Sequence, residues 1–368
     1  MKRCFLRRFK VSLRLGIMAA RRGKRRVRYR HWQGFFFTMA NENHFMRTAG
    51  FCCLMLSFAS FGANAEHRQT QQDRELATNS KNCYDPGDAT EIRLWEDRAP
   101  GAVGDDPCRD IPYLKMYRAP GDTAPTRTAI IVMPGGGYDR LSDCKEQAPV
   151  GEYFSQKLHV TTFVLFYRLV QKNGVYRYPI PMWDAQRAIK LVRYRSNQYG
   201  FDPNKLGVFG FSAGGHLATM MAVHSATDFK LDRHDVVDAL NGRPNFLGLG
   251  YPIISMLPDE FASPNSLGHL LQGYEGRALV SLERHLSGQY NVTPHAPPTF
   301  LFESLDDAQI SPQNSVLFAG ALQEARVPHE THLFPHGKHG AGLASDIPQE
   351  SEWPRMFHDW LVKSGYLP

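Results

Sequence analysis

The stretch that most constrains this chain is residues 207–216, which read Gly-Val-Phe-Gly-Phe-Ser-Ala-Gly-Gly-His. Ser212 lies between Gly210 and Gly214; it follows a short apolar run typical of a buried strand and precedes a mostly apolar helical pattern. The chain must therefore turn from a strand directly into a helix, which leaves no room for side chains two residues either side of the serine. We expect this turn to hold the Ser212 hydroxyl above a sheet as a nucleophile, with the backbone N–H of Ala213 pointing to where an oxyanion would form.

The net charge of +7 is concentrated at the N-terminal end. Residues 1–38 hold 13 Lys or Arg and no Asp or Glu, which leaves 30 basic against 36 acidic residues in the rest of the chain. Because that remainder is acidic on balance, it gives no reason to expect DNA or RNA as a partner. The 368 residues suffice for one large α/β domain, and no internal repeat suggests an array.

The N-terminal region has the features of a leader. Residues 46–65 combine a basic start, an apolar run and Ala63-Asn64-Ala65, which is the order found in signal peptides, and the run is too short to span a membrane. We predict removal after Ala65 and a secreted or periplasmic chain. Residues 1–45 are then a basic leader from a start assigned too far upstream, or an unusually long leader. A core helix over 46–65 is the less favoured alternative.

Cysteine usage fits an exported chain, because disulfides persist in oxidising compartments. Three of the six cysteines follow the leader, at 83, 108 and 144. Cys83 and Cys108 flank a loop-rich segment and form our preferred pair, although three pairings are possible. Residues 66–89 are polar and are expected to be a linker without fixed structure. No Cys/His spacing resembles a zinc site, so we expect no metal.

Strand and helix patterns alternate over residues 90–368. Two period-two runs predict early antiparallel strands, and later β-branched or apolar runs predict buried parallel strands. With helices between them, we expect an α/β domain with a mostly parallel central sheet and helices on both faces. The predicted strands cover residues 91–95, 113–117, 127–133, 159–166, 205–209, 245–251, 299–303 and 330–334. The predicted helices cover about 145–158, 182–199, 216–224 and 313–325, and Asp184 is interpreted as a favourable charge at a helix N-terminus.

A Gly-rich turn, Pro134-Gly-Gly-Gly-Tyr138, follows the strand predicted over 127–133. Three glycines let backbone N–H groups approach a ligand closely, as an oxyanion beside Ser212 requires. A phosphate site is an alternative, but a P-loop needs Gly-Lys-Ser/Thr and a Rossmann turn needs G-x-G-x-x-G, and neither pattern is present. A flexible loop without a role is the plainer alternative.

Acids and histidines follow the last two predicted strands. Asp306 and Asp307 come after the strand over 299–303, and His336 and His339 come after the next. An exposed Asp pair or a loop histidine usually has no catalytic role. Here, however, both types stand at strand ends and in the order Ser, Asp, His, which is one of the orders used by catalytic triads.

Residues 254–296 break the alternation. They are rich in Pro, Ser and Gly and hold two short helical patterns near 267–271 and 279–286. A long irregular segment inside a domain is usually a functional insertion. We expect a small lid that covers the active site and shapes the acyl or alcohol pocket.

Together these motifs resemble the α/β-hydrolase esterases of the hormone-sensitive-lipase-like group, and most closely its bacterial secreted acetyl-xylan-esterase-like branch of carbohydrate esterases, often xylanase-associated. The similarity runs from about residue 92 to 361. It rests on Leu94-Trp95 with Ala99-Pro-Gly-Ala102, Met133-Pro-Gly-Gly-Gly-Tyr138, Tyr167-Arg168, Asp184-Ala-Gln-Arg-Ala188, Gly210-Phe-Ser-Ala-Gly-Gly-His-Leu-Ala218, Asp306-Asp307 with Asn314-Ser315, and Gly337-Lys-His-Gly340. The resemblance implies an α/β-hydrolase fold.

The resemblance also assigns roles. Ser212 is the nucleophile, His339 the general base and then acid, and Asp307 the group that orients the histidine. Asp307-Ala-Gln-Ile fits the family's Asp-x-x-Val pattern, which favours Asp307 over Asp306, and the flanking glycines favour His339 over His336. Where relatives often have His before the glycines, this chain has Pro134.

The expected reaction is ester hydrolysis through an acyl-serine intermediate, with Gly136, Gly137 and Ala213 as oxyanion donors. The resemblance implies short acyl groups, above all acetyl groups on carbohydrates such as xylan, and no cofactor. A serine peptidase or amidase of the same fold would instead cleave peptide or anilide substrates. A non-catalytic binding module is the further alternative, disfavoured because Ser212, Asp307 and His339 are all present.

Overall fold

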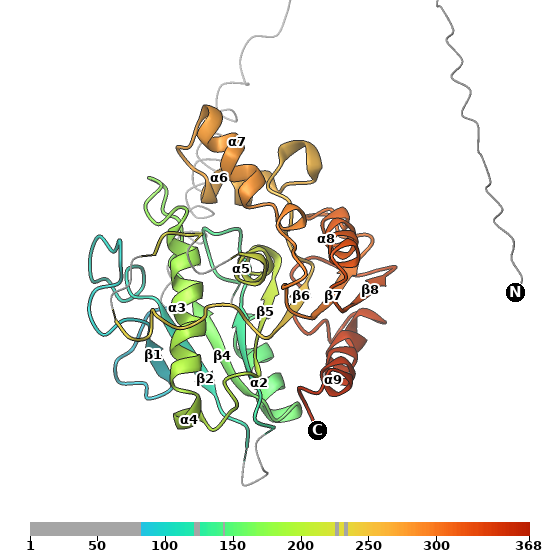
Figure 1. Ribbon diagram of the computed structural model, residues 1–368, viewed down its shortest axis with the longest axis horizontal. Helices are drawn as coiled ribbons and strands as arrows, with labels where there is room; N and C mark the ends of the chain where they lie inside the picture. Colours follow the sequence, from blue (N-terminus) through green and yellow to red (C-terminus); the bar gives the residue numbers. More distant parts are fainter. Residues whose placement is uncertain (1–81, 121–125, 143, 225–227, 232–234) are drawn as a thin grey trace, which may run out of the picture. The chain divides into compact units, whose positions relative to one another are not determined.

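An eight-stranded sheet forms the centre of the computed structural model, which describes residues 82–120, 126–142, 144–224, 228–231 and 235–368 (Figure 1). The strand order is β1-β2-β4-β3-β5-β6-β7-β8. β2 is antiparallel to β1 and β4, and every other neighbouring pair is parallel. The bounds are β1 Glu91–Arg93, β2 Tyr113–Tyr117, β3 Ala129–Met133, β4 Thr161–Phe166, β5 Leu206–Phe211, β6 Phe246–Gly250, β7 Thr299–Ser304 and β8 His329–Phe334. This confirms the predicted fold class, including the early antiparallel strands.

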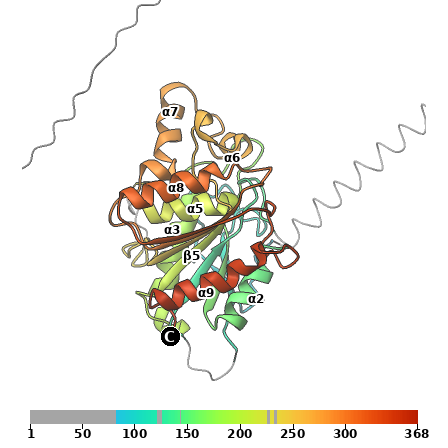
Figure 2. The ribbon, with the colours of Figure 1, turned by 90° about the vertical axis from the view of Figure 1, so that its right-hand side faces the viewer.

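Helices cover both faces of the sheet. α3, α5 and α8 lie on one side, and α2 and α9 lie on the other (Figure 2). Every residue of β3, β4, β5, β6 and β7 is buried, as apolar strands covered on both faces must be. The helices are α2 Ala148–Lys157, α3 Ile180–Tyr194, α4 Ser196–Tyr199, α5 Ser212–Val223, α6 Pro264–Leu270, α7 Gly276–His285, α8 Gln313–Glu324 and α9 Trp353–Lys363, with 3-10 turns at Pro258–Glu260, Gly288–Tyr290 and Glu350–Glu352.

Aromatic side chains join α9 to the sheet. The rings of Phe302 and Trp353 stack with centroids 4.7 Å apart, and Phe209 lies 5.1 Å from the same indole. Trp353 is fully buried, and its indole N–H donates to the carbonyl of Gly342 at 3.0 Å. α9 therefore packs on the sheet and also contacts the loop after β8.

The interpretation of Asp184 as a charge at a helix N-terminus is wrong. α3 begins at Ile180, so Asp184 lies beyond its first turn, and its side chain is fully buried. Its carboxylate accepts from the guanidinium of Arg168 at 2.6 and 3.0 Å and from the Arg168 backbone N–H at 2.9 Å. The pair joins α3 to the end of β4. The predicted helix over 182–199 is also divided, with α3 ending at Tyr194 and a short α4 following.

The described part of the predicted linker is not unstructured. Cys83 and Cys108 form a disulfide, as predicted, and Cys144 is exposed. The backbone N–H of Tyr84 donates to Pro107 at 2.9 Å, and Asp88 forms an ion pair with Lys115 on β2 at 2.9 Å. Residues 82–89 are therefore tied to the domain. The predictions for residues 1–81, including the signal peptide, lie outside the described residues.

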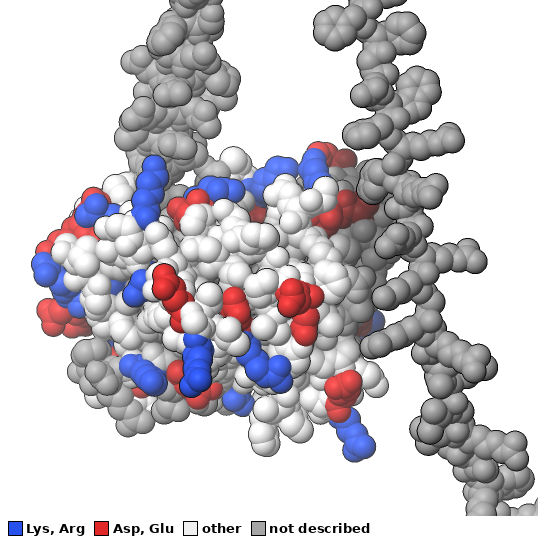
Figure 3. Space-filling model, turned by 90° about the horizontal axis from the view of Figure 1, so that it is seen from above, with Lys and Arg blue, Asp and Glu red and all other residues white. Residues whose placement is uncertain are grey.

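Seen from the end where α6 and α7 lie, the surface mixes both signs of charge among uncharged side chains (Figure 3). None of the helices in the described part of the chain is both long and apolar enough to cross a membrane.

Candidate active site

Ser212 occupies a strained turn between β5 and α5. β5 ends at Phe211, α5 begins at Ser212, and the serine has a φ of 51°, a region that side-chain-bearing residues rarely adopt. A Cβ at Gly214 would collide with the carbonyl oxygen of Met133, and one at Gly210 would collide with that of Gly214. Glycine at both positions therefore lets the turn form, as the G-x-S-x-G spacing predicts.

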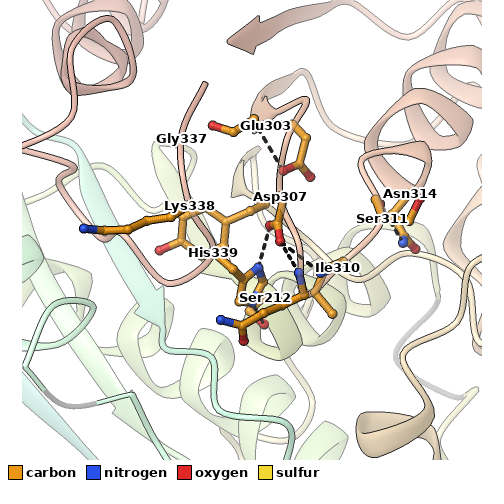
Figure 4. A network of polar contacts seen from close by, with 12 residues as sticks. Ser212, Glu303, Asp307, Ile310, Ser311, Asn314, Gly337, Lys338 and His339 are labelled. Atoms are coloured by element: carbon orange, nitrogen blue, oxygen red, sulfur yellow. Dashed lines mark hydrogen bonds and ion pairs between the residues drawn. The ribbon is translucent and has the colours of Figure 1, made fainter. Parts of the chain in front are cut away.

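A continuous chain of hydrogen bonds joins Ser212, His339 and Asp307 (Figure 4). The Nε2 of His339 lies 2.8 Å from the Ser212 hydroxyl, and its Nδ1 lies 2.7 Å from the Asp307 carboxylate. Asp307 follows β7 and His339 follows β8, so parallel strands deliver both groups to one edge of the sheet. Asp307 also accepts backbone N–H groups from Gln309 at 2.8 Å and Ile310 at 3.0 Å, which fix its carboxylate.

The second Asp/His pair lies outside this arrangement. Asp306 bonds to His336 at 2.9 Å, and the His336 side chain is 85% exposed. The structure thus brings together Asp307 and His339, the members that the family pattern favours, and leaves Asp306 and His336 at the surface.

The pKa values of the acids at this site are shifted in opposite directions. Burial alone would raise the pKa of Asp307, but its hydrogen bond to His339, the histidine's charge and the two backbone donors outweigh burial and lower the pKa. Behind it, burial raises the pKa of Glu303 to about 8 and that of Glu350 to about 7, and the charge of Asp307 adds to both increases. The Glu303 carboxyl contacts the Ser304 N–H and the Ser315 hydroxyl, each at 2.9 Å.

The Gly-rich loop lies against the serine. It follows β3, and a Cβ at Gly135 would come within 2.8 Å of the Ser212 Cβ. Gly136 and Gly137 have φ values of 120° and 67°, which favour glycine, and both line the cavity that holds Ser212 and His339. Ala213, the third predicted oxyanion donor, is the second residue of α5 and is buried.

The cavity at this site has a volume of about 980 Å³. One wall comes from the segment predicted as a lid, through Ser263, Asn265, Ser266 and His269. The imidazole Nδ1 of His269 lies 3.0 Å from the carbonyl oxygen of Gly137, so α6 rests on the Gly-rich loop. In contrast, α7 buries only Glu283 and leaves Val280 62% exposed.

Two buried links hold parts of the site together. His216 of α5 contacts the hydroxyl of Tyr138 through Nδ1 at 2.6 Å and the carbonyl oxygen of Leu286 through Nε2 at 2.7 Å, and burial lowers its pKa to about 4. The neutral ring therefore connects the serine helix, the Gly-rich loop and the end of the lid segment. The second link, through Glu146 and Tyr251, is described below.

Among the described side chains, no group of three or more His, Cys, Asp or Glu is arranged to hold a metal ion. The polar groups beside Ser212 are instead suited to proton transfer and to binding a developing negative charge.

Comparison with known sequences finds a matching family and several similar enzymes. The sequence model of the BD-FAE family matches residues 114–322. The chain is 31% identical over 239 residues to endo-1,4-beta-xylanase B of Butyrivibrio fibrisolvens, covering 64% of this chain and 35% of that protein. It is 28% identical over 242 residues to the acetylxylan esterase of Xylanibacter ruminicola, covering 64% and 46%. The matched region thus spans between a third and a half of these relatives.

Solved structures share the architecture. An acetyl ester-xyloside bifunctional hydrolase from Caldicellulosiruptor lactoaceticus is 38% identical, with 76% of this chain and 97% of that chain aligned at a TM-score of 0.67. A thermophilic esterase from Thermogutta terrifontis is 22% identical, with 77% and 96% aligned at a TM-score of 0.61, and supports the fold alone.

Proposed function

The chain belongs to the BD-FAE family, and we propose that it is a serine esterase that releases short acyl groups, above all acetate, from carbohydrate esters such as acetylated xylan. The observation that carries the proposal is the hydrogen-bonded chain from Asp307 through His339 to Ser212, at 2.7 and 2.8 Å, beside a Gly-rich loop. A hydroxyl, an imidazole and a carboxylate in this order are the groups that acyl transfer through serine requires.

In the proposed first half-reaction, the Ser212 oxygen attacks the ester carbonyl carbon while His339 Nε2 takes the hydroxyl proton. Asp307 stabilises the resulting imidazolium, and the tetrahedral oxyanion accepts N–H groups from Gly136, Gly137 and Ala213. Each such donor contributes roughly 3–4 kcal/mol in comparable hydrolases. The bond to the alcohol oxygen then breaks, and His339 protonates the leaving alcohol.

In the second half-reaction, His339 takes a proton from water as the water oxygen attacks the acyl-enzyme. The second tetrahedral species collapses, the bond to Ser212 breaks, and His339 returns its proton to the serine oxygen as the acid leaves. No step requires a metal ion or an organic cofactor.

The carbohydrate substrate is supported by the relatives, one named an acetylxylan esterase and one an acetyl ester-xyloside hydrolase. The cavity wall offers Asn265, Ser266 and His269, whose polar groups suit the hydroxyls of a sugar better than a long acyl chain.

We propose in addition that residues 46–65 direct export and are removed after Ala65, that 90–368 form the catalytic domain, and that 254–296 serve as its lid. The order of basic, apolar and small residues near the N-terminus supports export. N-terminal sequencing of protein expressed in a bacterial host tests this, and an uncleaved cytoplasmic chain would contradict it.

The central test compares the full chain with Ser212→Ala on p-nitrophenyl esters from acetate to decanoate, on acetylated xylan and on a peptide anilide. We expect turnover of acetate esters and acetate release from xylan, both lost in Ser212→Ala. Anilide cleavage would reassign the chain as a peptidase or amidase. Absence of any activity that depends on Ser212 would leave a binding module as the explanation.

A further inference from the structure

Glu146 is a buried carboxyl group inside the catalytic cavity that the proposed mechanism does not use. It precedes α2, is 1% exposed, and lines the same cavity as Ser212 and His339. Burying a carboxyl group is unfavourable unless its oxygens are hydrogen-bonded, and an apolar side chain would fill the same space without this penalty. The hydrogen bonds of Glu146 must therefore offset this penalty.

Both oxygens of Glu146 hold parts of the site. Oε2 accepts the backbone N–H of Gly135 at 2.7 Å, and Oε1 accepts the hydroxyl of Tyr251 at 2.9 Å. The same hydroxyl accepts the backbone N–H of Gly342 at 2.8 Å. The four groups form one continuous chain, from the residue before Gly136 to a residue three positions after His339.

The backbone conformation and burial of Tyr251 fix its side chain in position for this contact. It directly follows β6 with a φ of 37°, a strained value for a bulky residue, and it is 1% exposed. Its ring lies 5.0 Å from the His339 ring, centroid to centroid, so it also packs beside the general base.

We propose that Glu146 is a positioning residue of the reaction that, through Tyr251, fixes the oxyanion loop relative to the loop that carries His339. The two loops follow β3 and β8, which do not pair directly, because β5, β6 and β7 lie between them in the sheet. Acyl transfer needs the base and the oxyanion donors in register around one carbonyl group, and small misplacements are costly in rate. This inference rests on the proposed esterase function.

Two variants of the full chain break the chain of contacts at different points. Glu146→Leu introduces an apolar side chain of moderate size, which has no oxygen to accept either the Gly135 N–H or the Tyr251 hydroxyl. Tyr251→Phe removes only that hydroxyl. Glu152→Gln is the matched control, because Glu152 is an exposed acid on α2.

We expect each of the two variants to lower kcat for p-nitrophenyl acetate by about 10- to 100-fold with KM within about twofold, because bound substrate is misaligned rather than lost. The kcat of the double variant should be no lower than that of the less active single variant, since both substitutions remove the same link. Glu152→Gln should retain the wild-type kcat. Thermal unfolding midpoints identify the folded variants, and Tyr251→Phe provides the test if Glu146→Leu does not fold.

A folded Tyr251→Phe or Glu146→Leu with wild-type kcat would overturn the link, as would losses that multiply in the double variant. Failure of the esterase proposal is separable, because it appears in the wild-type chain as activity that is absent or does not depend on Ser212.

Discussion

At the scale of single residues, the two Asp/His pairs offer a sharp comparison. His339 joins Asp307 to Ser212, whereas His336 is exposed and contacts the surface acid Asp306. We expect His339→Gln to lower kcat/KM for p-nitrophenyl acetate by about 1,000-fold or more, because the serine loses its base. His336→Gln should change it by less than about twofold, since exposed pairs contribute little. Comparable losses in both variants would contradict the assignment.

The residues of the site differ in how well the sequence alone predicts their roles. Ser212 is identified by local spacing, because the turn excludes side chains at 210 and 214. Asp307 and His339 need the order of strands and a family pattern, because the residues alone leave Asp306 and His336 equally eligible. Glu146 and Tyr251 are not predictable in this way, since they contact each other across 105 positions and neither lies in a recognisable motif.

At the scale of elements, the alternation of apolar strands and helices predicts the architecture because each buried strand must be covered on both faces. Predictions from local patterns fail where the residue that makes the contact is distant in the sequence. Asp184 has the position of a helix-terminal acid when only its helix is considered, yet Arg168, 16 residues earlier, determines its role. Likewise, the composition of residues 82–89 predicts a linker, but a disulfide to Cys108 orders them.

The Arg168–Asp184 pair also yields a prediction about how elements are joined. Asp184→Asn would leave a fully buried guanidinium without its counter-charge, so we expect a loss of about 3 kcal/mol or more in the free energy of unfolding, measured by urea denaturation. Asp359→Asn on α9 is the control, because its pair with Arg355 is exposed and should contribute little to the free energy of unfolding. Equal effects of the two substitutions would show that the buried pair does not join α3 to β4 as described.

At the scale of the whole molecule, the raised pKa of Glu303 links stability to pH. In the folded state burial raises this pKa from 4.5 to about 8, so folding favours the protonated acid. Its contribution to stability is therefore fully present below about pH 4.5 and is lost as the pH rises through about 8. The neutral carboxyl can keep its contacts to Ser304 and Ser315, whereas the ionised form is both buried and close to Asp307.

Glu303→Gln tests this linkage, because the amide resembles the protonated acid but cannot ionise. We expect the variant and the wild type to have similar free energies of unfolding near pH 5. By pH 9 the variant should be more stable, by an amount on the order of 2–4 kcal/mol. Glu324→Gln, at the exposed end of α8, should follow the wild-type curve. Parallel curves for Glu303→Gln and the wild type from pH 5 to 9 would mean that Glu303 ionises in the folded protein much as it does in the unfolded chain, and that the acid behind Asp307 is charged while the site is at work.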